Sequence, residues 1–208
     1  MSDVHPLMTV AILNLAAAVS PGPAFALVTQ TAASSKRGVA WATAAGTVAA
    51  SLIWATTALL GWQFVLARAA AIYRFLLIAG GLYLCFIGWA TWRHAPDALP
   101  EAAGGDSAPL VGFRKGLLLG LSNPKVIVFF GTIFTTLFGP STPEGFRWAA
   151  LLVVLINEGV WYGALATLFG TLAARRLYRR IKVHAERFFG GLLVFFGVRL
   201  VWSGCRNG

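Results

Sequence analysis

The sequence predicts an all-α membrane protein of six transmembrane helices, arranged as two inverted three-helix repeats in which helices 1 and 4 are broken by proline. Of the 208 residues, 58% are hydrophobic and only 12% are charged, and the mean hydropathy is +0.73. This is too apolar for a soluble domain of this size. Six apolar runs are long enough to cross a bilayer, and two of them carry proline breaks at corresponding positions.

The apolar runs define the predicted spans, each of about 20 residues or more. They cover residues 6–31, 40–66, 72–92, 115–138, 147–173 and 186–204. The polar linker 94–112 separates a first repeat, residues 1–93, from a second repeat, residues 113–208. Because each half has an odd number of spans, the second half must enter the membrane from the opposite side, so repeated halves would be inverted.

Two sequence patterns support a repeat and close helix packing. Gly80-Gly81 in the third span aligns with Gly190-Gly191 in the sixth, and an aligned tryptophan follows each pair at the same offset. Small residues that allow helices to approach closely recur at four-residue spacing. They are Ala42, Gly46 and Ala50 in the second span, Gly116 and Gly120 in the fourth, and Gly159 and Gly163 in the fifth. These faces could meet a neighbour in the same chain or a second subunit, so a homodimer stays open.

The basic residues near the span ends predict the orientation. Eleven would share one side: Lys36, Arg37, Arg93, Arg114, Lys115, Arg175, Arg176, Arg179, Arg180, Lys182 and Arg187. Four would share the other side: Arg68, Arg74, Arg147 and Arg206. The first side is predicted to be cytoplasmic, which places the linker 94–112 in the cytoplasm and both termini in the periplasm. The net charge of +10 does not indicate nucleic-acid binding, because the basic residues lie between apolar runs.

The two breaks predict a binding site at membrane depth. They are Ser20-Pro21-Gly22-Pro23 and Ser122-Asn123-Pro124-Lys125. Proline has no N–H, so carbonyls in the preceding turn lose their partners, which is tolerated in a membrane mainly inside protein or along a wet cavity. Paired interruptions in two halves indicate a transporter's binding site. The half-helices that restart there would direct N–H groups near Ala24 and Phe25, and near Lys125 and Val126, toward a substrate carboxylate.

Glu158 is the only acidic residue deep in a predicted span, so we expect it to face the protein interior or water. It is the candidate ligand for a substrate ammonium and the candidate proton-coupling group. The alternative is a structural partner for Lys125 or for the backbone near Asn123. Lys125 itself is expected to pair with a carboxylate or substrate, with snorkelling as the alternative. The complete predicted substrate site is Ser20, Pro21, Gly22, Pro23, Ala24, Asn123, Pro124, Lys125, Asn157 and Glu158.

Other chemistries lack the residues they need. Cys85 and Cys205 are lone thiols without a CxxC motif, and no histidine lies inside a predicted span. The sequence therefore predicts no metal, no cofactor and no enzyme. A channel, a carrier of another small solute, or a non-transport membrane enzyme remains as an alternative.

These motifs resemble those of the LysE/RhtB family of amino-acid exporters. The resemblance rests on the two proline motifs, on Phe113-Arg114-Lys115-Gly116 ahead of the second, and on the pattern Gly80-Gly81, Tyr83, Gly88-Trp89, and it covers essentially the whole chain. It implies a multi-pass protein of the bacterial cytoplasmic (inner) membrane that exports amino acids or related small metabolites by proton antiport. Ala24 departs from the Asn or Asp that members often carry, and Glu158 from a common Asp.

The charges inside the membrane favour a neutral substrate. The carboxylate of a zwitterion would bind at the two breaks, and its ammonium would bind Glu158. Little net charge would then move into the low-dielectric interior of the membrane. A cationic amino acid would need a second deep acid. We therefore expect neutral amino acids, or small analogues such as homoserine derivatives, to be exported in preference to lysine or arginine.

Overall fold

The structure is a computed structural model that describes residues 4–20, 22–66, 70–97, 108–138 and 142–206. This part of the chain forms eight α-helices and no strand. They are α1 (Val4–Val19), α2 (Pro23–Ser34), α3 (Arg37–Leu66), α4 (Ala70–Arg93), α5 (Pro109–Leu121), α6 (Pro124–Leu137), α7 (Glu144–Leu168) and α8 (Leu172–Arg206). The all-α prediction is confirmed for these residues, while Pro21 and most of the predicted linker lie outside them.

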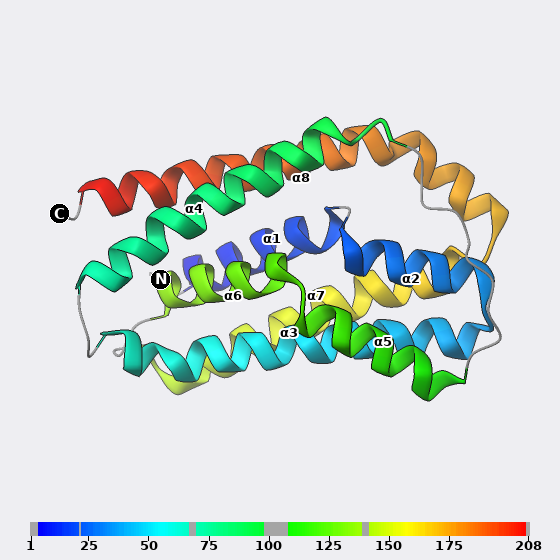
Figure 1. Cartoon of the computed structure of the whole chain (residues 1–208), viewed down its shortest axis with the longest axis horizontal. Helices are drawn as coiled ribbons and strands as arrows, with labels where there is room; N and C mark the ends of the chain where they lie inside the picture. The colour runs from blue at the N-terminus through cyan, green and yellow to red at the C-terminus, as the bar shows by residue number, and fades with distance from the viewer. Residues whose placement is uncertain (1–3, 21, 67–69, 98–107, 139–141, 207–208) are drawn as a thin grey trace.

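The helices run side by side along the long axis of the molecule (Figure 1). The helices α4 and α8 pack along one another, and α3 packs against both α5 and α7. The helix α1 begins and α8 ends at one end of the bundle, where α3 also ends, whereas α2 and α7 end at the opposite end and α4 runs toward it (Figure 1). This arrangement places the basic helix ends that we predict to be cytoplasmic together.

Length and composition mark this as a multi-pass membrane protein. Three helices contain apolar segments long enough to cross a membrane, at Arg37–Gly61, Glu144–Leu168 and Lys182–Arg206. Two bent pairs qualify together: α1 with α2, bent by 57°, and α5 with α6, bent by 58°. The described residues thus hold up to five spans by these criteria. The third predicted span, 72–92, corresponds to α4, is not among these five, and remains a prediction.

The helices that contain the fourth and sixth predicted spans begin before the predicted span bounds. The helix α5 starts at Pro109 rather than at residue 115, and α8 starts at Leu172 rather than at residue 186. The added turns carry basic side chains, which a hydropathy criterion excludes from a span although they favour a helix as well as most residues do. The break at Asn123 therefore lies in the middle of the α5–α6 pair.

Glycines explain how closely the helices approach. A Cβ on Gly88 would lie 2.5 Å from the Gly190 carbonyl oxygen across the α4–α8 contact. A Cβ on Gly120 would lie 2.5 Å from the Cβ of Ala50, and one on Gly116 would overlap the backbone of α3. The predicted small-residue faces of the second and fourth spans therefore meet each other within one chain. Gly159 differs, because no neighbour lies within 4 Å of its Cβ position.

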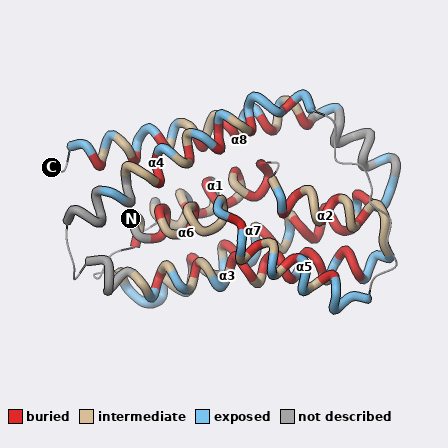
Figure 2. The backbone as a smooth tube through the Cα atoms, in the orientation of Figure 1, coloured by how far each residue is buried: buried red, intermediate tan, exposed pale blue. Residues whose placement is uncertain are grey.

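Buried residues concentrate on the inward faces of the helices, and exposed residues on the outward faces (Figure 2). The core includes an aromatic row on α6 in which Phe130 lies 5.2 Å from Phe129 and 5.3 Å from Phe134, centroid to centroid. Outward faces carry large apolar side chains such as Leu60 and Val160, which are 69% and 68% exposed. A surface of this kind suits contact with lipid rather than water.

Candidate functional site

The two broken helices meet, and the lysine after the second break binds the backbone of the first. The Lys125 ammonium donates a 3.1 Å hydrogen bond to the carbonyl of Ser20, directly after the end of α1. The Asn123 side chain caps α6 by accepting a 3.0 Å hydrogen bond from the backbone N–H of Lys125. Lys125 thus satisfies a carbonyl that the first break leaves without a helical partner.

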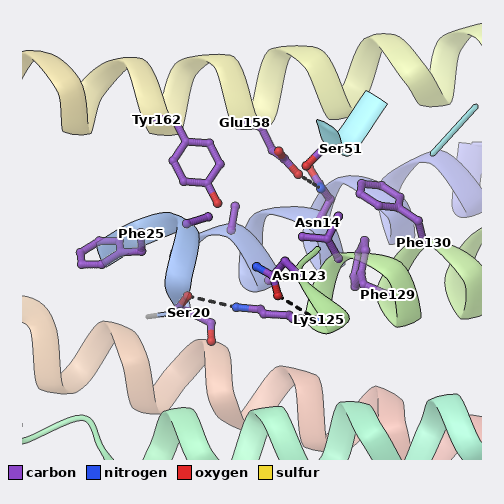
Figure 3. A pocket seen from close by; sticks show the side chains of 15 residues that line it. Asn14, Ser20, Phe25, Ser51, Asn123, Lys125, Phe129, Phe130, Glu158 and Tyr162 are labelled. Atoms are coloured by element: carbon purple, nitrogen blue, oxygen red, sulfur yellow. Dashed lines mark hydrogen bonds between the residues drawn. The ribbon is translucent and has the colours of Figure 1, made fainter. Parts of the chain in front are cut away.

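A small chamber lies where the breaks meet α7 (Figure 3). Its volume is about 30 Å³, enough for one or two water molecules. Its polar lining includes Ser20, Asn123, Lys125 and Glu158. Aromatic side chains, Phe25, Phe129 and Phe130 among them, supply much of the apolar wall. The chamber is therefore a small cavity with a mixed polar and apolar lining.

Glu158 projects from the middle of α7 into this chamber and is only 5% exposed. The Asn14 side chain donates a 2.9 Å hydrogen bond to one carboxylate oxygen, Oε1. Ser51 lies beside the carboxylate, and Tyr162, one helical turn further along α7, points its ring into the same space (Figure 3). The second oxygen, Oε2, has no hydrogen-bond partner in the described residues, and neither has the Asn14 oxygen Oδ1.

Opposite charges line the chamber from two different helices. Lys125 belongs to α6 and Glu158 to α7, and they form no ion pair: the ammonium bonds to Ser20 and the carboxylate to Asn14. The chamber therefore brings a basic and an acidic side chain from two helices into one cavity without a hydrogen bond between them.

Two larger cavities lie among the helices, and one of them adjoins the chamber. One, of about 470 Å³, shares Gly22, Phe25, Asn123 and Lys125 with it and extends to His94 beyond the end of α4. We call this cavity the vestibule. Another, of about 460 Å³, lies between α1, α6 and α8. The chamber and the vestibule are therefore neighbouring cavities that share part of their lining.

Comparison with known proteins decides the family. The family model described as LysE type translocator matches residues 15–204, nearly the whole chain. The chain belongs to the LysE type translocator family. The threonine efflux proteins of Salmonella typhi and Escherichia coli (strain K12) are each 34% identical to the translocator over 94% of its length and 97% of theirs. The uncharacterized membrane protein YahN of Escherichia coli (strain K12) is 28% identical over 98% of this chain and 92% of its own. No solved structure matches.

Most of the predicted site residues come together in the translocator. Those that line the chamber are Ser20, Gly22, Ala24, Asn123, Lys125 and Glu158. Pro23 and Pro124 line the vestibule instead, and Pro21 lies outside the described residues. Asn157 does not line the chamber: its side chain donates a 2.8 Å hydrogen bond to the carbonyl of Ala11 and so ties α7 to α1.

One expectation about the second break is wrong. The N–H groups of Lys125 and Val126 were expected to be available to a substrate, but both donate to Asn123, the first to its side chain and the second to its carbonyl. The carboxylate of Glu158 forms its hydrogen bond with Asn14 rather than with Lys125 or Asn123, and its role toward a substrate stays a prediction. The first break differs from the second in its N-cap: Gly22 has no side chain, so no side-chain hydrogen bond caps the start of α2.

The predicted site lacked three chamber residues with polar side-chain groups, Asn14, Ser51 and Tyr162, as well as the apolar residues of the wall. Tyr162 follows Glu158 by four residues on a helix, so the shared face was a usable signal. Asn14 is a polar residue inside an apolar span, which is a weaker signal. No sequence signal distinguishes Ser51 from the other small residues of α3.

A second buried acid lies away from the chamber. Glu186 is fully buried on α8 and accepts a 2.8 Å hydrogen bond from Lys182, which also donates to the carbonyl of Ala95. Lys182, counted among the residues that set the orientation, is therefore a packed side chain rather than an exposed anchor. Of these two buried acids, only Glu158 lines the chamber.

Proposed function

We propose that this translocator is a secondary transporter that exports amino acids from the cytoplasm, prefers neutral zwitterions and operates by proton antiport. The observation that carries the proposal is the placement of Lys125 and Glu158 in one buried chamber without an ion pair between them. The names of the related threonine efflux proteins support amino-acid export and make threonine the first substrate to test.

The charges of the chamber define a binding mode. The substrate carboxylate binds near the Lys125 ammonium and the start of α2, where the backbone N–H of Ala24 carries partial positive charge. The substrate ammonium binds Glu158. A neutral amino acid satisfies both groups. The side chain of a cationic one would bring a second positive charge into the vestibule, whose described lining holds Lys125 and Lys182 against a single acid, Asp97.

Glu158 supplies the coupling in this mechanism. A proton and a substrate ammonium compete for the same carboxylate oxygens, so the site carries one or the other across the membrane. Each exported amino acid would then be exchanged for an entering proton, as antiport requires. The single acid of the chamber gives no separate place for the proton.

The proposed architecture is two inverted repeats in the bacterial inner membrane, with both termini periplasmic. The matching bends of 57° and 58° support it, as do the reciprocal glycine contacts between α4 and α8. The vestibule, which reaches the end of α4 where Arg93 and His94 lie, would open to the cytoplasm in this orientation. Assembly as a homodimer remains a prediction.

Counterflow into proteoliposomes tests the proposal. Vesicles preloaded with unlabelled threonine should accumulate labelled threonine transiently, because a carrier exchanges and a channel does not. Competition by threonine amide and by the decarboxylated amine should be at least about tenfold weaker, since each loses a hydrogen bond to a charged group. Equal competition by the amine would refute carboxylate recognition, and preferential exchange of lysine would refute the charge argument.

A further inference from the structure

We propose that Asn14 is a specificity-determining residue: its side-chain oxygen and the free oxygen of Glu158 together bind a primary ammonium, so that the translocator rejects N-methylated amino acids. The inference rests on the proposed function and narrows its substrate class. It starts from two acceptor atoms, Asn14 Oδ1 and Glu158 Oε2, that are buried without a hydrogen-bond partner in the described residues. Buried polar atoms are rarely left in this state, so a donor from a ligand or water is required.

The orientation of the Asn14 amide follows from its neighbour. An ionised carboxylate only accepts hydrogen bonds, so the amide must turn its NH₂ group toward Glu158, as the 2.9 Å bond from Nδ2 to Oε1 shows. The carbonyl oxygen of the same amide is then available to another donor. The residue is 1% exposed and lines the chamber, so this donor must enter the chamber to reach it (Figure 3).

A primary ammonium fits these acceptors better than other groups. It carries three N–H donors and a positive charge, whereas a hydroxyl carries one donor and a carboxylate none. The Glu158 carboxylate would neutralise the positive charge of the ammonium and accept one hydrogen bond, and the side-chain oxygen of Asn14 would accept a second. The hydroxyl oxygen of Tyr162, which points into the same space, would accept a third (Figure 3). An N-methyl group would place carbon against an oxygen that needs a donor.

The size of the chamber leads to the same selectivity. A volume of about 30 Å³ holds a group comparable to one or two waters, as an ammonium is, but not three added methyl groups. The carboxylate then reaches Lys125, which the chamber shares with the vestibule of about 470 Å³, and the side chain extends into that larger space. We therefore expect the translocator to discriminate more strictly among amino acids that differ in substitution at the amino nitrogen than among those that differ in the side chain.

Counterflow with threonine, N-methylthreonine and N,N,N-trimethylthreonine tests the inference in the wild-type protein. Each hydrogen bond lost from the charged group should weaken the apparent affinity about tenfold. Equal exchange of threonine and its trimethyl derivative would overturn the inference while leaving the proposed function intact. Failure of every amino acid to exchange would overturn both.

Variants separate recognition from a structural role of Asn14. In Asn14→Ala the affinity for threonine should fall about tenfold, and the affinity for N-methylthreonine should fall by less. The ratio of the threonine affinity to the N-methylthreonine affinity should therefore decrease. If Asn14 merely held Glu158 in place, both affinities would fall by the same factor. Asn14→Ser provides a second variant. Its hydroxyl can still donate a hydrogen bond toward Glu158, but its side chain is too short to offer a second oxygen to the ammonium, so the same decrease in the ratio is expected. Asn157→Ala is the matched control: this amide also joins α7 to α1, outside the chamber, so the ratio should stay at the wild-type value.

Discussion

Replacing Glu158 with glutamine should separate exchange from proton-driven export. The amide has nearly the shape of the carboxylate and can still accept the hydrogen bond that Asn14 donates at 2.9 Å. It cannot carry a proton or a negative charge. We therefore expect Glu158→Gln to lose accumulation driven by a pH gradient entirely, while substrate exchange persists at reduced affinity.

The size of the loss follows from the site. A hydrogen bond to a charged group contributes about 1.5–3 kcal/mol and a neutral one about 0.5–1.5 kcal/mol, so binding of the ammonium should weaken by about 1–2 kcal/mol, roughly tenfold in affinity. The fold should tolerate the change, because the glutamine fills the same space and a neutral amide is less costly to bury than an ionised carboxylate. We expect the free energy of unfolding to change by less than about 1 kcal/mol.

The assay uses purified protein in liposomes with an imposed pH gradient, and counterflow of labelled threonine in the same vesicles without one. Glu144→Gln is the control, since Glu144 begins the same helix but is exposed and lies outside the chamber. Accumulation by Glu158→Gln with the wild-type dependence on pH would remove Glu158 from the coupling mechanism. Loss of both exchange and accumulation in a folded variant would show that the charge is needed for binding itself.

Three further changes test other parts of the structure. Lys125→Met should reduce the affinity for threonine about tenfold or more and let its decarboxylated amine compete equally, whereas Lys115→Met, on the exposed face of α5, should change neither value in counterflow assays. Gly116→Ala should destabilise the protein by about 1–3 kcal/mol in detergent unfolding, because the added methyl overlaps the backbone of α3, whereas Gly159→Ala should be neutral or stabilising. Cys205, exposed near the end of α8, should react with a membrane-impermeant maleimide in intact cells, and protection there would contradict the predicted periplasmic terminus.

The sequence predicted those features that depend on a few neighbouring residues. Prolines inside an apolar run must interrupt a helix, so the bent pairs could be expected without knowing their neighbours. A lone carboxylate within a span must be shielded, so the burial of Glu158 could also be expected. The bond from Lys125 to the Ser20 carbonyl joins residues 105 positions apart and depends on how the two bent pairs dock, which no local pattern specifies.

The site residues that were missed depend on the same long-range placement. Asn14 and Ser51 become part of the chamber because α1 and α3 pack beside α7, and neither stands out by its spacing. Conversely, Asn157 adjoins Glu158 in sequence but faces another side of α7, since adjacent helical positions are about 100° apart. Proximity in sequence was therefore a poor guide on a helix, and spacing by four residues, as for Tyr162, was a better one.

The two breaks are alike in their prolines but differ in what they offer a ligand, and the residue that caps each new helix explains why. Asn123 has a side chain that occupies the first available N–H of α6, so the second break presents the Lys125 ammonium instead of its backbone. Gly22 has no side chain, so the first break leaves the backbone at the start of α2 facing the chamber. If the halves are inverted repeats, this difference converts a symmetric pair of breaks into one site with a single cation. That site can distinguish the two ends of a zwitterion, which a symmetric pair of helix termini could not.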